Sequence, residues 1–320
     1  MDIALIKSYT DKPWRSPETY QKIETSLQKS WTTHSIHTQN PETLRTFLSD
    51  LQKTSKGDCF VFNIAEFLDE ENKTGFLPTL LEEWQIPHLG STAKTIALGL
   101  DKAKTKQILL ENHITTPQYF TVTALNDTIH TSAKEIGYPL IVKPSCEGGH
   151  IGISSDSIVH NPADLDEAIQ NILETLHEPA LVEEYIISKE MREFSVGIIN
   201  CDPPLFLPIE IDFAAMPIEH PILSFEAAQK DLERTKLIKD ETLAKRVIEL
   251  SLQTFNVVGA SDYSRVDLRM DDHDCYVLEI NIMPGLGPHS FLPEAAQEIH
   301  NLDYAQFIQT LTQTSIQRQK

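Results

Sequence analysis

Two neighbouring apolar segments near the C-terminal end of the chain carry three oxygen-bearing side chains. Segment 265–270 reads RVDLRM and contains Asp267, whereas segment 277–281 reads VLEIN and contains Glu279 and Asn281. Carboxylate and amide oxygens without Cys or His partners suit Mg²⁺ better than Zn²⁺. With water and phosphate oxygens they can complete the octahedron in which enzymes hold a magnesium nucleotide. These three residues are therefore the candidate metal ligands.

The spacing of the two segments predicts a hairpin with these side chains on one face. Both segments have the length of a strand, and the polar turn Asp271–Asp274 separates them. Because strand side chains alternate between faces, we expect Val277 to point the same way as Glu279 and Asn281. The alternative is an amphipathic hairpin whose acids merely face solvent. The Met-Pro-Gly sequence just after the hairpin favours a functional site.

Composition sets limits on the class of protein. A chain of 320 residues, 40% hydrophobic and 23% charged, suggests a globular protein of two or three domains. The apolar runs are strand-sized and no basic region precedes one at the start, so we predict neither a membrane span nor a secretory signal. The net charge of −20 argues against a nucleic-acid partner. Four widely spaced cysteines predict reduced thiols in the cytoplasm, not a zinc site or disulfide framework.

Strand and helix signals alternate through the first hundred residues and predict a mostly parallel βα domain. Longer strands after residue 181 predict a sheet that includes the hairpin. Strands are predicted at 2–6, 59–63, 118–123, 138–143, 181–186, 193–200 and 205–211. Helices are predicted at 17–29, 41–51, 77–84, 162–175, 242–255, 291–299 and 304–317, with two more meeting near Asp101. The prediction is an α/β (α+β) fold with domains at 1–100, 101–180 and 181–320.

A lysine followed by a glycine-bearing loop could bind phosphate groups. Lys143 ends an apolar run, and the loop Glu147-Gly-Gly-His150 follows it. Glycine lets backbone N–H groups approach phosphate oxygens, and the lysine adds a positive charge. Lys102, at the start of a predicted helix, could supply a second ammonium group. The alternative is an ordinary strand and turn with solvated lysines, since the loop matches neither the Walker nor the Rossmann sequence.

Segment 181–186, with the sequence LVEEYI, carries side chains suited to a purine. Glu183 could accept a hydrogen bond from the adenine amino group, the backbone at 184–186 could meet the ring edge, and Tyr185 or Ile186 could cover the ring face. Glu193 could hold the ribose hydroxyls. The alternative is that these acids are simply exposed at strand ends.

Two further segments have a candidate role. Ser290 follows a glycine-containing loop and precedes a predicted helix, so it is a candidate N-cap. A helix N-terminus also favours an anion such as a carboxylate, and the two roles are compatible. Residues 213–240 are the least regular part of the sequence. A long loop inside a compact domain is often a functional lid.

Taken in order, these motifs resemble the ATP-grasp superfamily and, within it, the D-alanine–D-alanine ligase family. The resemblance spans roughly residues 86–293, and its last motif is the most specific. The matching stretches are Ile86-Pro-His-Leu-Gly-Ser91 with Asp101-Lys102, Val142-Lys143-Pro144 with Glu147-Gly148, Val182–Ile186 with Glu193-Phe194, and Arg265-Val-Asp267 through Glu279–Gly285 with His289-Ser290. The resemblance implies a three-domain ATP-grasp fold: a mostly parallel N-terminal βα domain, a small central domain and a C-terminal domain with an antiparallel sheet. ATP would be held between the last two domains.

The resemblance also implies roles for individual residues. Arg265 and the backbone of Gly285 would stabilise a tetrahedral oxyanion. The metal ligands would hold two Mg²⁺ ions, for which Mn²⁺ could substitute. The residues implied for ATP are Lys102, Lys143, Glu147, Gly148, Gly149, Glu183, Glu184, Tyr185, Ile186, Glu193 and Leu278. Those implied for the metal are Asp267, Glu279 and Asn281, and those for the substrates are Ser290, Phe291 and His150.

The implied reaction joins a carboxylate to an amine in two steps. The carboxylate attacks the γ-phosphorus of ATP to give an acyl phosphate, and the amine then displaces phosphate. Metal and lysines would neutralise the transferring phosphoryl group, and Arg265 would stabilise the charge of the collapsing intermediate. The implied partners are small amino acids and a second copy of the chain in a homodimer. For the parent family the product serves peptidoglycan synthesis.

The sequence departs from the family on the side of the acyl-donating substrate. Residues 7–14 contain no glycine where the family has a glycine-rich loop with a glutamate after the first strand. Gly149 and His150 stand where two serines normally follow the Glu-Gly of the phosphate loop. Three residues are inserted before Glu193. No tyrosine-containing lid with its lysine is recognisable in 213–240, although that region contains Lys230, Lys236 and Lys239.

Three functions remain open. The first is a D-alanine–D-alanine ligase. The second is a ligase of the same mechanism for other amino acids, which the stretch Asn63-Ile-Ala-Glu66 also favours because it resembles divergent ligase-like proteins. The third is a nucleotide-binding or regulatory protein without ligase activity. Arg265 argues against the third, since a protein that only binds a nucleotide has no use for an oxyanion-stabilising arginine.

Overall fold

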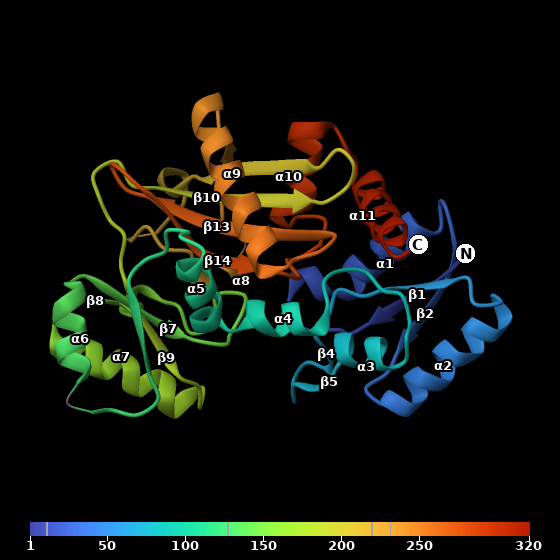
Figure 1. Ribbon diagram of the computed structural model, residues 1–320, viewed down its shortest axis with the longest axis horizontal. Helices are drawn as coiled ribbons and strands as arrows, with labels where there is room; N and C mark the ends of the chain where they lie inside the picture. Colours follow the sequence, from blue (N-terminus) through green and yellow to red (C-terminus); the bar gives the residue numbers. More distant parts are fainter. Residues whose placement is uncertain (11, 127, 219, 231) are drawn as a thin grey trace.

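The computed structural model describes residues 1–10, 12–126, 128–218, 220–230 and 232–320. Within these ranges the chain forms an N-terminal sheet, a central sheet and a C-terminal sheet, each with its own helices (Figure 1). In Figure 1 the N-terminal part lies to the right, the central part to the lower left and the C-terminal sheet above them. The predicted α/β fold, with a parallel N-terminal sheet and an antiparallel C-terminal one, is confirmed.

The N-terminal part is a parallel sheet in the order β2-β1-β3 with helices on both faces. Its elements are β1 (Asp2–Lys7), α1 (Pro17–Leu27), β2 (Thr32–His37), α2 (Pro41–Thr54), β3 (Cys59–Phe62), the small hairpin β4 (Phe67–Asp69) and β5 (Thr74–Phe76), and α3 (Leu77–Glu83). Ile3 and Leu5 pack against α1 and the C-terminal helix α11 (Tyr304–Arg318). Ala4 and Ile6 pack against α2 and α3 on the other face. The N-terminal sheet therefore shares its core with the end of the chain.

The central part is an antiparallel sheet in the order β6-β9-β7-β8, covered on one face by two helices. Its elements are β6 (Tyr119–Val122), α6 (Ile129–Ile136), β7 (Leu140–Pro144), β8 (Ile158–Val159), α7 (Pro162–Thr175) and β9 (Ala180–Glu184). Val142 and Val182 lie in the core beneath the helices. Because side chains alternate along a strand, the neighbouring Lys143 and Glu183 point to the opposite face.

The C-terminal part is an antiparallel sheet in the order β12-β11-β10-β13-β14. Its elements are β10 (Arg192–Ile199), β11 (Leu205–Ile211), α8 (Phe225–Gln229), β12 (Thr235–Leu237), α9 (Glu241–Val258), β13 (Tyr263–Met270), β14 (Cys275–Asn281), α10 (Phe291–His300) and α11. Val196, Val266 and Leu268 pack against α9 in one core. The same alternation turns Arg265 and Asp267 to the other face. Helices α4 (Ala93–Leu100) and α5 (Lys102–Glu111) connect the N-terminal and central parts.

Most elements with a clear periodicity or cap were predicted correctly. Asn40 caps α2 by accepting a hydrogen bond from the backbone of Thr43 at 3.0 Å, and Asp101 separates α4 from α5. The elements β2, β8, α6 and the β4–β5 hairpin were not predicted from the sequence. The sequence of β2, TTHSIH, is mostly polar because this strand lies at the edge of its sheet, where its residues are only partly covered. The predicted lid region at 213–240 contains the short elements α8 and β12.

A β-bulge corrects the predicted arrangement of the hairpin. Asp267 is opposite Glu279, but Leu268 is opposite Val277, so Leu278 is an extra residue on β14. Val277 is fully buried in the core beneath α9, and the prediction that it points the same way as Glu279 is wrong. The bulge instead turns Leu278 towards the same pocket as Glu279. Leu278, implied as a nucleotide contact only by the resemblance, thus lies beside Glu279 because of a local break in the strand alternation.

Candidate active site

A cavity of about 800 Å³ lies where the three parts of the chain meet. It is lined by the loop after β1, the β4–β5 hairpin, α4, the loop after β7 and the segment that follows β14. A smaller pocket of about 70 Å³ lies between the non-core faces of the central and C-terminal sheets. His150 and Glu279 line both, so the two spaces adjoin.

The three candidate metal ligands lie together at this junction. The Asn281 side chain donates to Asp267 Oδ2 at 2.9 Å and to Glu279 Oε1 at 3.4 Å. The carboxylates face each other across the β13–β14 pair, where Asp267 is directly opposite Glu279. The donor set fits Mg²⁺, since rotating the Asn281 amide would bring its oxygen towards the two carboxylates and give three oxygen ligands.

Positive groups surround these acids. Arg265 donates to both carboxylate oxygens of Asp267, with distances of 2.7 to 3.2 Å, and Ser195 donates to Asp267 at 2.6 Å. The Lys102 ammonium lies 3.3 Å from Glu279 Oε2. Burial alone would raise the pKa of Glu279, but the charges of Lys102 and neighbouring cations outweigh it and hold the pKa well below its usual range. The acid is therefore ionised and ready to bind a cation.

Lys143 and Glu183 form a buried ionic cluster with a third residue, Lys106. The ammonium groups of Lys143 and Lys106 lie 3.0 and 3.3 Å from Glu183 Oε1, although neither has the geometry of a hydrogen bond. Lys106 also donates to Thr116 at 2.6 Å. Lys106 was not predicted from the sequence. It lies four residues after Lys102 on α5, and residues with this spacing share a helix face. The spacing could therefore have predicted that Lys106 lies near the site.

The buried Lys106 predicts that stability increases with pH in the alkaline range. Burial lowers its pKa from 10.5 to about 8, although Glu183 raises it. Between these values the unfolded chain binds more protons at Lys106 than the folded chain, so the free energy of unfolding contributed here rises with pH. We expect Lys106→Met to remove that rise. Urea unfolding of both proteins near pH 8 and near pH 10 measures the difference, and an identical pH dependence would contradict the assignment.

In the smaller pocket, Glu193 is paired with an arginine that the sequence analysis did not select. Arg269 donates through Nε to Glu193 Oε2 at 2.8 Å and through Nη2 to the same oxygen. Arg269 also donates to the backbone of Pro221 at 2.9 Å and lies 4.9 Å from the centre of the Tyr185 ring. Strand alternation had placed Arg269 on the face of Arg265 and Asp267. Both bonds go to Oε2, so Glu193 Oε1 remains available within the pocket.

The remaining predicted purine residues line the same pocket. Glu184, Tyr185, Ile186 and Leu278 surround it together with Glu183, Glu193 and Lys143. Ile222 and Leu223, from the predicted lid region, cover it from the other side. The Tyr185 hydroxyl donates to the backbone of Pro221 at 3.0 Å, which ties this lid region to the strand that ends beside it.

The predicted phosphate loop lines the larger cavity, from Glu147 to His150. The Glu147 backbone oxygen accepts from Lys102, and its carboxylate pairs with Lys73 of the β4–β5 hairpin. His150 lies 3.5 Å from Glu233, which belongs to the predicted lid region. Gly149 has a φ of +62°, a left-handed conformation that favours glycine. The loop thus touches both the N-terminal part and the lid region.

Ser290, Phe291 and Gly285 line the larger cavity next to Trp14. Ser290 is the N-cap residue of α10, as predicted, but its side chain makes no capping hydrogen bond and so remains available to a ligand. A Cβ at Gly285 would lie 3.1 Å from both Ser290 Oγ and the Trp14 ring. A larger residue at position 285 would therefore require Ser290 or Trp14 to shift.

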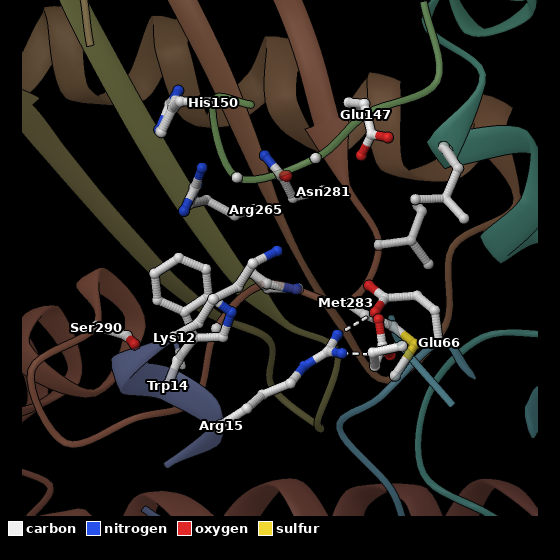
Figure 2. Close-up of a pocket in the computed structure, with 18 of the residues that line it drawn as sticks. Lys12, Trp14, Arg15, Glu66, Glu147, His150, Arg265, Asn281, Met283 and Ser290 are labelled. Carbon is white, nitrogen blue, oxygen red and sulfur yellow. Dashed lines mark hydrogen bonds and ion pairs between the residues drawn. The ribbon is translucent and has the colours of Figure 1, made fainter. Parts of the chain in front are cut away.

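The loop after β1 provides an ionic cluster that the sequence analysis missed. Arg15 is buried and pairs with Glu66 and Glu70, and Figure 2 shows its side chain reaching Glu66 beside Met283. Burial opposes the charge on Arg15, but the two carboxylates outweigh it and raise the pKa of the guanidinium. These residues are about 50 positions apart in sequence, so only the fold brings them together. In place of glycine, the loop after β1 therefore contains a buried arginine that two acids hold in place.

Two antiparallel sheets that face each other across a pocket lined by lysines and acids define a member of the ATP-grasp class. Within that class, the chain belongs to the D-alanine–D-alanine ligase family. The family model described as D-Ala–D-Ala ligase C-terminus matches residues 107–313.

Related sequences agree with this assignment. The chain is 33% identical over 235 residues to the uncharacterized protein y4sG of Sinorhizobium fredii, covering 72% of this chain and 67% of that protein. It is 31% identical to a D-alanine–D-alanine ligase of Pediococcus pentosaceus, covering 74% of this chain and 64% of the relative. It is 30% identical to D-alanine–D-alanine ligase B of Xanthomonas campestris, covering 75% and 73%. The matches thus span about two thirds of the length of these relatives.

A solved structure extends the similarity of fold to the whole chain. The D-alanine–D-alanine ligase of Bacillus anthracis, crystallised with ATP, superposes with a TM-score of 0.76 at 23% sequence identity. The superposition covers 99% of this chain and 98% of the other. The N-terminal part, which the family model does not reach, therefore also has the fold of this ligase. Within the described residues no helix has both the length and the apolar character needed to cross a membrane.

Proposed function

We propose that this protein is an ATP-dependent carboxylate–amine ligase that works through an acyl phosphate. The observation that carries the proposal is the convergence of Asp267, Glu279 and Asn281 at the junction of the two pockets, beside Lys102 and Arg265. A cation held there would lie at the end of the pocket predicted for the purine. It would also face the cavity in which Ser290 and Gly285 lie.

The residues suggest a division of tasks. The smaller pocket would hold adenosine, with Glu193 Oε1 accepting from the ribose hydroxyls while Arg269 fixes the other oxygen. Lys143, Lys102 and the loop 147–150 would bind the phosphates. The three metal ligands would hold Mg²⁺, which when bound supplies charge neutralisation at the transferring phosphoryl group. The domains proposed at 1–100, 101–180 and 181–320 would each contribute one wall of the larger cavity.

The larger cavity would hold the two amino-acid substrates. The carboxylate of the first attacks the γ-phosphorus of ATP, and ADP leaves. The amine of the second attacks the carbonyl carbon of the acyl phosphate, loses a proton and expels phosphate to form the amide. Arg265 and the backbone N–H of Gly285 would stabilise the oxyanion of the tetrahedral intermediate that forms when the amine attacks. Ser290, whose hydroxyl makes no capping bond, would bind the carboxylate of the second substrate.

We expect the purified protein to release phosphate from Mg-ATP only when a suitable amino acid is supplied. The measurement is phosphate release with a panel of D- and L-amino acids, singly and in pairs, with mass spectrometry of the product. D-alanine alone as the best substrate supports the parent activity, and thus a role in peptidoglycan synthesis. Better activity with another acid supports a divergent ligase, which the rebuilt loop around Arg15 favours. No release with any pair contradicts the ligase proposal and supports a nucleotide-binding protein.

A further inference from the structure

Acids outnumber arginines and lysines in the lining of the larger cavity, and all but one of the described basic residues there pair with a carboxylate. Each arginine and lysine in its lining, except Lys12, forms an ion pair with a carboxylate of the described residues. The pairs are Arg15 with Glu66 and Glu70, Lys73 with Glu147 and Glu178, Lys102 with Glu279, and Arg265 with Asp267. Lys12 has no carboxylate partner within the described part of the chain. An anion that enters the cavity would therefore meet one ammonium group that no acid among the described residues neutralises.

Lys12 lies beside the predicted phosphate loop. Its Nζ is 3.8 Å from the position that a Cβ on Gly149 would occupy. It is 5.8 Å from the centre of the Trp14 ring, close enough for a cation–π contact. Figure 2 shows Lys12 and Trp14 on the side of Ser290, with Arg265, His150 and Asn281 across the pocket from them. The ammonium thus stands between the phosphate loop and the residues predicted to hold the substrates.

The backbone around Lys12 is held in place from several sides. The Lys12 backbone donates to Thr10 Oγ1 at 3.2 Å, and the Arg15 backbone donates to the Lys12 oxygen at 3.0 Å. Arg15 is anchored by its two carboxylates. Trp14 packs against the loop that contains Gly287, where a Cβ would lie 2.9 Å from the Trp14 Cα. These contacts hold the backbone of Lys12 at the edge of the cavity.

The lysines of the predicted lid region do not serve this cavity. Lys230 pairs with Glu226, and Lys236 lies 3.5 Å from Glu210 and 3.4 Å from Asp212. Lys239 is exposed. None of the three lines either pocket. Among the described lysines of the N-terminal part, Lys12 and Lys73 reach the phosphate loop, and Lys73 is already paired with two acids.

We propose that Lys12 is a catalytic residue that binds the terminal phosphoryl group of the nucleotide and follows it as it passes to the substrate carboxylate. This inference rests on the proposed function, because it takes ATP as the occupant of the smaller pocket. In the transfer the bond from the γ-phosphorus to the bridging oxygen breaks, and a bond to the carboxylate oxygen forms. No proton moves at Lys12, whose ammonium stabilises the equatorial oxygens throughout. The N-terminal part would thereby complete the phosphoryl site as well as hold the substrate.

The test separates contact with the γ-phosphate from contact with the amino acid. The affinities of ADP and of the non-hydrolysable analogue AMP-PNP, both with Mg²⁺, are measured by calorimetry for the wild type, Lys12→Ala and Lys12→Arg. We expect Lys12→Ala to weaken AMP-PNP about 10- to 100-fold, as for the loss of one charged hydrogen bond, while ADP changes less than about twofold. Lys12→Arg should keep most of the preference for AMP-PNP. Lys53→Ala, on the exposed surface of α2 away from both pockets, is the matched control and should change neither affinity.

Each result has a definite meaning. Equal affinities of Lys12→Ala and the wild type for AMP-PNP would overturn the proposal, and so would equal losses for ADP and AMP-PNP. An increase only in the KM of an amino acid would overturn it too, since Lys12 would then bind the substrate carboxylate. If the wild type binds both nucleotides but releases no phosphate with any amino acid, the ligase function fails while the binding difference still tests Lys12. If it binds neither nucleotide, both proposals fail.

Discussion

Glu279→Gln is expected to abolish amino-acid-dependent phosphate release, with a loss of at least about 10³-fold. The substitution keeps the shape of the side chain but removes the charge that faces Lys102, Asn281 and Asp267. A bound metal ion contributes several kcal/mol to the stabilisation of a phosphoryl-transfer transition state, and each tenfold in rate corresponds to about 1.4 kcal/mol. Phosphate release at saturating ATP, with Mg²⁺ varied, measures the effect.

The metal assignment predicts a particular pattern in that variant. The concentration of Mg²⁺ or Mn²⁺ needed for half-maximal activity should rise, while the thermal unfolding temperature stays close to that of the wild type. Glu249→Gln, on the exposed side of α9, is the control for general effects of losing an acid. Wild-type phosphate release by Glu279→Gln would show that this carboxylate holds no catalytic metal. The control variant Glu249→Gln should release phosphate at the wild-type rate.

Arg265→Met is expected to lower the turnover number by about 10²- to 10³-fold. Removal of one oxyanion-stabilising donor typically costs about 2.7–4 kcal/mol in the transition state. The guanidinium is mostly buried, faces the larger cavity and makes three hydrogen-bond contacts to Asp267, so it is oriented before the reaction begins. Turnover number and KM are measured for ATP and for the best amino acid of the panel.

The oxyanion role predicts a loss in the turnover number with little change in the KM for ATP. Arg265→Lys should recover only part of the activity, because an ammonium group lacks the planar fork that contacts both Asp267 oxygens. Arg246→Met, an exposed position on α9, is the matched control. If Arg265→Met changes only the KM for ATP, the arginine serves nucleotide binding and the oxyanion assignment is wrong.

The N-terminal part departs from the sequence pattern of the D-alanine–D-alanine ligase family. The loop after β1 lacks glycine and instead places Lys12, Trp14 and Arg15 at the cavity. Arg15 is neutralised by Glu66 and Glu70, whereas Lys12 remains unpaired within the described residues. The amino-acid panel and the Lys12 variants address two different consequences of this loop. The first concerns the choice of substrate, and the second concerns the completeness of the phosphoryl site.

Local sequence determined those features whose physical cause is local. Caps such as Asn40 and Asp101 fix helix starts because their side chains bind the first backbone N–H groups of the helix. Alternation along β13 placed Asp267 and Arg265 on one face because strand side chains repeat every two residues. The same rule failed at Val277, where the β-bulge inserts one residue and reverses the face. A bulge depends on the pairing of two strands, which one strand's pattern does not encode.

The sequence by itself therefore indicated the family, the α/β fold with a parallel N-terminal part and an antiparallel C-terminal part, and the set of acids and lysines from which a nucleotide site could be built. Only the tertiary structure decided which partners these residues have. Lys106 joins Glu183, Arg269 fixes one oxygen of Glu193, and Arg15 meets Glu66. These pairs join residues about 50 to 77 positions apart, and their contact energy depends on distance and burial, which arise only when the chain folds.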